Sequence, residues 1–92
     1  MIKTFRPKGL RRFFEDDDGS KLSPDMLQRI RLILSTLHAA QDSEGMNVPA
    51  FRLHSLKGEL KGVFSATVRA NWRIIFRFED GDAFDVDFVD YH

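Results

Sequence analysis

Three successive runs near the end of the chain alternate between apolar and polar side chains, and this pattern constrains the fold most. The runs cover Val63–Arg69, Arg73–Phe78 and Phe84–Val89. Apolar residues at every second position give each run one apolar face, which predicts β-strands that are buried on one side. Because only short connections separate the runs, we expect an antiparallel meander.

The connection between the second and third runs decides how their residues pair. Residues directly opposite each other in an antiparallel pair share a face, so pairing Phe76 with Phe84 requires an odd loop length. We therefore predict a three-residue loop, Glu79–Gly81, with Gly81 in the left-handed conformation. A two-residue turn would instead place Arg77 opposite Phe84 and mix the two faces.

The preceding connection should follow the same pairing rule. This rule predicts a three-residue loop, Arg69–Asn71, in which Asn71 adopts the left-handed conformation that asparagine tolerates. In the resulting register, Arg73 lies on the polar face, opposite Thr67 on one side and Asp87 on the other.

Two helices and a short edge strand are expected before the meander. Met1–Phe5 is short and mixed in character, which indicates a strand at the sheet edge. Apolar residues at i, i+3 and i+4 predict a short helix over Lys8–Glu15. Ser23–Asp25 combines a hydroxyl cap, a proline and a carboxylate, which is typical of a helix start. The second helix should run to about Ala40, with its apolar stripe facing the sheet.

The length and composition indicate one α+β domain over residues 1–92. The chain has 42% hydrophobic residues, which is typical of a globular domain, and no cysteine, which excludes disulfides and thiolate metal sites. No apolar run approaches the roughly 20 residues of a membrane span, and the first residues do not resemble a signal peptide. We therefore expect a cytoplasmic protein with no membrane partner.

The formal net charge is zero, but the charges are arranged in blocks. Residues 1–12 carry five basic groups and no acid, and residues 52–77 carry six against Glu59 alone. A polyanion responds to such a local field rather than to the net charge, so phosphate binding is compatible with this arrangement. The alternative is solvated surface charge that pairs across strands.

The groups able to do chemistry suit one reaction best. The sequence has no Gly-rich phosphate loop and no Cys/His ligand spacing, and it shows no nucleophilic serine paired with a histidine, so metal-assisted hydrolysis and acyl transfer are poorly supported. RNA cleavage without metal needs a base, cations for the phosphorane charge and an acid for the leaving oxygen. These groups could come from Lys57, Arg73 and the terminal Asp90, Tyr91 and His92. No metal or cofactor is expected.

Several of these residues have structural alternatives. Arg73 could form a cross-strand pair with Asp87, and the last two residues could be a frayed terminus. Trp72 begins a strand on the apolar face, which favours core packing over base stacking. His54 could be a strand histidine or a member of the site. Neighbouring residues of a strand point to opposite faces, so if Leu53 faces the core, His54 faces away from it.

Several short motifs, in order along the whole chain, resemble the HigB-type toxins of the RelE superfamily of bacterial toxin–antitoxin systems. They are Lys8-Gly9-Leu10, Phe13-Phe14-Glu15, Arg52-Leu53-His54-x-Leu56-Lys57-Gly58, Asn71-Trp72-Arg73, Gly81-Asp82-Ala83 and Val89-Asp90-Tyr91-His92. The resemblance implies a microbial-ribonuclease-like α+β fold, with two N-terminal helices packed on an antiparallel sheet. It also implies an endoribonuclease that cuts mRNA in the ribosomal A site and halts translation.

Residue by residue, the resemblance implies a catalytic site and a partner. The site residues would be His54, Lys57, Arg73, Asp90, Tyr91 and His92, with Asn71 near the mRNA base. In that scheme His92 or Asp90 is the base, Lys57 and Arg73 hold the phosphate, and Tyr91 orients the substrate. The implied partner is a helix-turn-helix antitoxin of the HigA type, whose complex with the toxin binds operator DNA.

Two other functions remain open from the sequence. A non-catalytic module could hold RNA or a partner protein through Arg52, Lys57, Lys61 and Arg69, acting within a DNA-binding repressor complex. A toxin that has lost its activity could survive in the same complex. The acidic clusters at Glu15–Asp18 and Asp82–Asp87 could serve as docking surfaces for a basic antitoxin segment.

Overall fold

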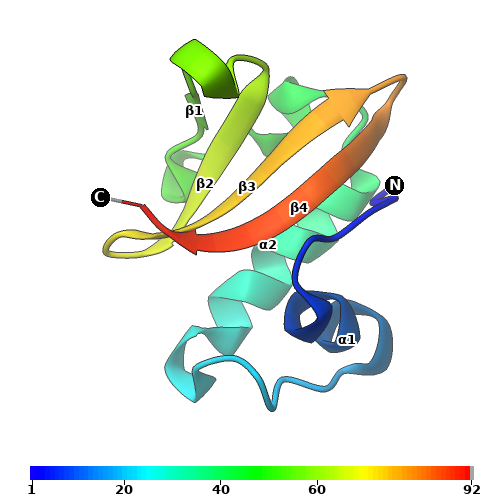
Figure 1. The fold of residues 1–92 in the computed structure, drawn as a ribbon, viewed down its shortest axis with the longest axis vertical. Helices are drawn as coiled ribbons and strands as arrows, with labels where there is room; N and C mark the ends of the chain where they lie inside the picture. The colour runs from blue at the N-terminus through cyan, green and yellow to red at the C-terminus, as the bar shows by residue number, and fades with distance from the viewer. Residues whose placement is uncertain (92) are drawn as a thin grey trace.

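A computed structural model describes residues 1–91, so the predictions made for His92 lie outside the described residues. The chain forms a four-stranded antiparallel sheet in the order β1-β2-β3-β4, with β1 at one edge and β4 at the other (Figure 1). The strands are β1 His54–Ser55, β2 Val63–Arg69, β3 Trp72–Glu79 and β4 Asp82–Asp90. This confirms the α+β class and the antiparallel meander of the last three strands.

Two α-helices precede the sheet, as predicted. They are α1 Lys8–Asp16 and α2 Leu27–Ala39, the latter preceded by the 3-10 turn η1 Pro24–Met26. Further 3-10 turns are η2 Ser43–Met46, η3 Pro49–Phe51 and η4 Gly58–Leu60. None of the helices within residues 1–91 has the length and apolar character needed to cross a membrane.

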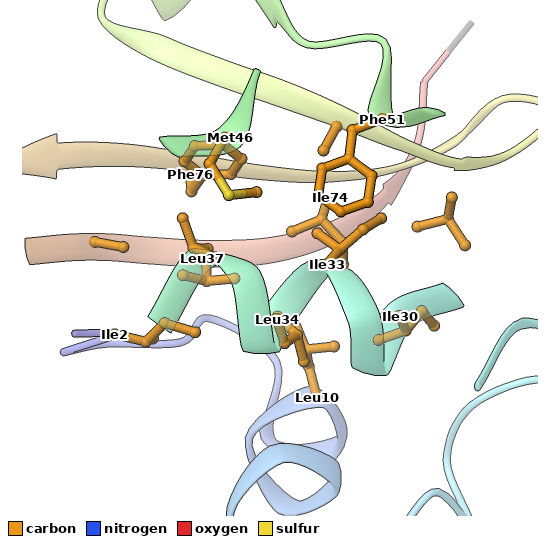
Figure 2. Packing of buried hydrophobic residues seen from close by; sticks show 14 of the residues in the cluster. Ile2, Leu10, Ile30, Ile33, Leu34, Leu37, Met46, Phe51, Ile74 and Phe76 are labelled. Carbon is orange, nitrogen blue, oxygen red and sulfur yellow. The ribbon is translucent and has the colours of Figure 1, made fainter. Parts of the chain in front are cut away.

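The helices form two layers behind the sheet. Figure 2 shows α2 between the sheet and α1, with Leu34 of α2 and Leu10 of α1 pointing toward each other. The predicted stripe of α2 is buried throughout, and it meets the apolar face of the strands in one core. The stripe consists of Met26, Ile30, Ile33, Leu34 and Leu37. Burial of each such side chain contributes about 1.5–3 kcal/mol, which makes α2 the centre of the fold.

The turn between β3 and β4 differs from the prediction. Glu79 pairs with Asp82, so the connection is the two-residue turn Asp80–Gly81 and not a three-residue loop. Asp80 has φ 51° and Gly81 φ 84°, as a type I′ hairpin turn requires at both central positions. As a result Arg77 lies opposite Phe84, the pairing that we expected the chain to avoid.

A β-bulge at Asp85 returns the apolar side chains of β4 to the core face after the pairing of Arg77 with Phe84. Asp85 has φ 53°, and the register shifts here, so that Asp85 and Val86 together lie opposite Phe76. The extra residue turns Val86 back into the core, where it is fully buried. Phe84 stays on the outer face, with the Arg77 guanidinium 5.2 Å from its ring centroid. The predicted pairing of Phe76 with Phe84 is therefore wrong.

The N-terminal segment supports the bulge. Residues 1–6 run parallel to β4 and form two isolated bridges, Ile2 with Ala83 and Phe5 with Val86, in place of the predicted edge strand. The bulge separates the two bridges. Within it, the backbone N–H of Asp85 donates to Thr4 Oγ1 at 2.8 Å. This segment therefore satisfies backbone groups that a regular ladder would have paired.

The turn between β2 and β3 also has two residues, Ala70 and Asn71, because Arg69 pairs with Trp72. The predicted three-residue loop is wrong, and the left-handed residue is Ala70, with φ 51°, not Asn71. A register shift at Val68 compensates for the shorter turn. The predicted pairing of Arg73 with Thr67 is confirmed.

Replacing Ala70 by glycine should stabilise the protein by about 0.5–1 kcal/mol. A left-handed conformation costs an L-residue roughly 1–2 kcal/mol, of which the greater chain entropy of unfolded glycine offsets about 0.5–1 kcal/mol. Urea denaturation would measure the change. Ala39→Gly in α2 is the control, since φ there is helical and glycine should destabilise by up to about 1 kcal/mol. Equal effects at both positions would contradict the prediction.

Candidate functional site

A pocket of about 330 Å³ lies where β1, β2 and β3 meet the end of the chain. It brings together four of the predicted catalytic residues, His54, Lys57, Arg73 and Tyr91. The remaining lining residues are Ser55, Leu56 and Ser65. A basic pair, an imidazole and a phenol thus face one cavity, although they come from three separate parts of the chain.

Local structure explains how the first two residues reach the pocket. His54 lies on the edge strand β1, opposite Ser65 of β2. It is exposed while Phe51 and Leu56 nearby are buried, which agrees with the prediction that it faces away from the core. Lys57 follows at the point where the chain leaves the sheet, because the next residue, Gly58, turns the backbone at φ 70°.

Tyr91 is held by the turn between β2 and β3. Its backbone N–H donates to the carbonyl oxygen of Asn71 at 2.7 Å, one residue beyond the end of β4. The side chain is 42% exposed and lines the pocket. The alternative of a frayed terminus therefore does not hold for residue 91, whose backbone is hydrogen-bonded.

Arg73 is positioned by a neighbouring hydroxyl. Its Nη1 donates to Thr67 Oγ1 at 2.9 Å, across the β2–β3 pair. Its Nε is buried, and among the described residues no hydrogen-bond partner accepts from it. The predicted position opposite Asp87 is wrong, because after the Asp85 bulge Arg73 pairs with Val89 and Asp87 pairs with Ile75. The alternative of an Arg73–Asp87 ion pair is therefore not found among residues 1–91.

The cations of the pocket differ from other cations of the protein. Arg31 pairs with Asp17 at 2.6 Å, Arg69 pairs with Asp25, and Arg77 pairs with Glu79 at 2.7 Å. By contrast, the described lining of the pocket includes two cations, Lys57 and Arg73, and no carboxylate. A positive site of this kind favours an anionic ligand such as a phosphodiester.

Other predicted residues do not line the pocket within the described part of the chain. These are Arg52, Lys61, Arg69, Asn71 and Asp90. Arg52, Lys61 and Asn71 are exposed. Asp90 pairs with Trp72, and strand alternation places it on the same face as Phe88. Trp72 stacks on Phe88 with ring centroids 4.8 Å apart, in agreement with the core-packing interpretation.

Arg69 is engaged elsewhere. Its guanidinium forms an ion pair with Asp25, at the start of the helical region that leads into α2. The Ser23 hydroxyl, and to a lesser degree Arg69, lower the pKa of Asp25 below its usual value. Both partners are largely exposed, so the pair is a surface interaction that competes with any RNA contact of Arg69.

The acidic run Glu15–Asp18 contains the end of α1. Asp17 adopts the left-handed conformation at the helix C-terminus, with φ 56°. Asp18 accepts from the backbone N–H of Ser20 at 3.1 Å, and the hydrogen bonds of Ser20 lower the pKa of Asp18. Within residues 1–91, no group of three or more His, Cys, Asp or Glu side chains could hold a metal ion.

Comparison with known proteins identifies the family. The profile described as "RelE-like toxin of type II toxin-antitoxin system HigB" matches residues 3–92. The chain is 41% identical over 92 residues to "Endoribonuclease HigB" of Proteus vulgaris, with both chains covered completely. It is 34% identical over 94 residues to "Toxin HigB-1" of Vibrio cholerae, covering 98% of that protein. The chain belongs to the HigB-like toxin family.

Solved structures agree with this fold. The toxin–antitoxin complex YoeB–YefM of Staphylococcus aureus contains a chain that matches with a TM-score of 0.65 at 18% identity, covering 100% of this chain and 98% of that one. The YoeB dimer from the same organism matches with a TM-score of 0.58, covering 99% and 97%. At this identity the likeness concerns the fold alone. Membership in a type II toxin–antitoxin family implies an antitoxin as partner.

Sequence reasoning missed two polar residues of this HigB-family site. Ser65 is 1% exposed and lines the pocket, and Thr67 holds the Arg73 guanidinium. Both lie at the polar positions of β2, between core residues such as Ala66. Alternate residues of a strand share a face, and this pattern places Ser65 and Thr67 on the same face of the sheet as Arg73. The alternation was therefore the signal that could have identified them.

Proposed function

We propose that this HigB-family toxin is an endoribonuclease that cuts mRNA in the ribosomal A site and so inhibits translation, without metal or cofactor. The observation that carries the proposal is the pocket in which Lys57 and Arg73 face His54 and Tyr91 with no carboxylate in its described lining. Family membership and the 41% identical endoribonuclease of Proteus vulgaris support the activity.

The proposed reaction is a transesterification at phosphorus. The 2′-oxygen of the substrate attacks the adjacent phosphorus as a base removes its proton, and the 5′-oxygen leaves with a proton from an acid. The products are a 2′,3′-cyclic phosphate and a 5′-hydroxyl. Lys57 and Arg73 stabilise the charge of the phosphorane, a contribution that is often the largest single one in such sites.

The remaining roles follow the same proposal. Of the two candidate bases, His92 is the one that we propose, because strand alternation places Asp90 on the face of Phe88, away from the pocket. His54 contributes to proton transfer. Tyr91 orients the substrate. Arg52, Lys61, Arg69 and Asn71 contact RNA outside the pocket, and because Arg69 is paired with Asp25, RNA has to compete for it.

In this proposal the toxin acts in the cytoplasm, where its partners are the ribosome, mRNA and an antitoxin. The ribosome presents mRNA, and a helix-turn-helix antitoxin of the HigA type neutralises the toxin. The toxin–antitoxin complex binds operator DNA through the antitoxin.

Mapping mRNA 5′ ends after induction of the toxin tests the proposal. We expect new 5′-hydroxyl ends within coding regions, and none on a matched transcript whose start codon has been removed. Cleavage of both transcripts would contradict dependence on the ribosome. Growth arrest with intact mRNA would favour the non-catalytic binding module instead.

A further inference from the structure

A second hollow, of about 270 Å³, lies on the outer face of the sheet. Its apolar lining residues are Val63 of β2, Ile75 and Phe76 of β3 and Leu60 of the η4 turn. Val63 and Ile75 are half-buried and Leu60 is 39% exposed. The volume lies just below the roughly 300–1,000 Å³ of typical small-molecule sites, so it suits a single ring system. Apolar side chains of this kind can pack against the face of a base, whose ring system is itself largely apolar.

The hollow adjoins the candidate active site along β3. Arg73, Ile75 and Arg77 occupy alternate positions of this strand and share its outer face. Arg73 lines the first pocket, and Ile75, only about 7 Å further along the strand, lines the second. The segment at η4 also spans both, since Lys57 lines the first pocket and Glu59 the second. An RNA strand whose phosphate lies at Arg73 and that follows β3 toward Arg77 would therefore reach the hollow.

The charges of the hollow do not suit a phosphate. Two cations, Arg6 and Arg77, face three carboxylates, Glu59, Asp85 and Asp87. Arg77 is already neutralised, because its Nε donates to Asp85 at 2.8 Å and its Nη1 to Glu79 at 2.7 Å. These hydrogen bonds, that to Glu79 first, raise the pKa of Arg77. The hollow thus contrasts with the first pocket, where Lys57 and Arg73 have no acid beside them in the described lining.

The two carboxylates of the hollow that do not bond Arg77 are Asp87 and Glu59, and they can recognise a base through hydrogen bonds. One oxygen of Asp87 accepts from the backbone N–H of Phe88 at 2.8 Å, which orients the carboxylate and leaves acceptor capacity on it. Glu59 lies on the exposed η4 turn at the opposite side of the lining. Carboxylates accept hydrogen bonds from exocyclic amino groups, as in the recognition of cytosine N4 by Asp or Glu. Uracil has no amino group, and its single edge donor, N3–H, lies between two carbonyl oxygens that repel a carboxylate.

We infer that this hollow binds the base of a nucleotide next to the cleaved bond, and that Asp87 and Glu59 select adenine, cytosine or guanine over uracil there. The inference rests on the proposed endoribonuclease function and adds a specificity-determining subsite to it. Asp87 and Glu59 are binding residues in this scheme and take no part in proton transfer.

Cleavage rates on ribosomes programmed with a set of matched mRNAs test the subsite. The mRNAs differ only in the nucleotides on either side of the cleaved bond. We expect the unmodified toxin to cut mRNAs with an amino-bearing base at one of these positions about tenfold faster than those with uracil, within the range of one base contact. Asp87→Asn and Glu59→Gln should each bring this ratio close to one, because an amide can also donate to uracil.

Asp16→Asn is the matched control, since Asp16 is exposed at the end of α1 and lies outside both pockets. It should leave the ratio unchanged. Asp87→Asn retains the oxygen that accepts from Phe88, and Glu59 lies on an exposed turn, so both variants should fold. Circular dichroism would verify this.

The outcomes separate the subsite from the proposed function. If the unmodified toxin cuts none of the mRNAs, the endoribonuclease proposal fails and the subsite fails with it. If it cuts them but both variants keep the ratio of the unmodified toxin, the subsite alone is overturned. If the variants keep that ratio and instead bind the antitoxin more weakly, the hollow is a protein-docking surface and the inference is likewise overturned.

Discussion

Replacing Arg73 by methionine should lower the rate of mRNA cleavage by about 10²–10³-fold, the loss typical for one preorganised charge-stabilising donor. Methionine keeps much of the aliphatic packing of arginine but cannot stabilise the charge that develops on the phosphorane. The protein should nevertheless fold, and its stability should stay the same or rise. The reason is that the buried Nε has no hydrogen-bond partner among the described residues, and such a group costs about 1–3 kcal/mol.

Single-turnover cleavage and urea denaturation of the same preparation would measure both effects. Arg31→Met is the control, because Arg31 is 55% exposed, pairs with Asp17 and lies outside the pocket. Its activity should equal that of the unmodified toxin. Undiminished cleavage by Arg73→Met would show that the pocket is not where the phosphate binds. A large loss of stability would mean instead that Arg73 is mainly a structural residue.

Replacing Leu34 by alanine should destabilise the protein by about 2–5 kcal/mol, as expected for a leucine truncated in a packed core. Leu34 is fully buried and lies in α2 on the side that meets α1, facing Leu10 (Figure 2). A domain of this kind has a total stability on the order of 5–15 kcal/mol. The change could therefore remove a large share of that stability, and urea denaturation would measure the free energy of unfolding.

Leu32→Ala provides a control with the same chemistry on the same helix. Leu32 is 53% exposed, so its truncation should change the free energy of unfolding by no more than about 0.5 kcal/mol. Similar losses for the two variants would contradict the arrangement in which α2 lies between α1 and the sheet.

The elements of this protein were largely predictable because their signals are local. The apolar stripe of α2 repeats at helical spacing, and the strands alternate at a period of two. The Asp80–Gly81 turn was also visible, as Asp-Gly is the strongest short signal for a hairpin. In an uninterrupted ladder, however, this turn places Arg77 opposite Phe84 and mixes the two faces, which is why the pairing rule favours a three-residue loop.

The candidate site was predictable in part. His54, Lys57, Arg73 and Tyr91 do line one pocket, and parity would have added Ser65. Asp90 belongs to the same short terminal motif as Tyr91 but pairs with Trp72 on the face of Phe88. Adjacent strand residues point to opposite faces, so a motif of consecutive residues cannot deliver all its side chains to one pocket without a change in backbone conformation.

The sequence by itself determined the α+β class, the position of α2 at the centre of the core, and Lys57 and Arg73 as the cations of the site. Only the tertiary structure decided the register of β4, and through it the partner of Arg73. The bulge at Asp85 depends on Thr4, whose Oγ1 accepts from the Asp85 N–H at 2.8 Å across 81 residues of chain. No window of local sequence contains such a contact. Together with the two-residue turn Asp80–Gly81, the bulge pairs Arg73 with Val89 and not with Asp87, so the residue opposite that guanidinium on β4 is not a carboxylate.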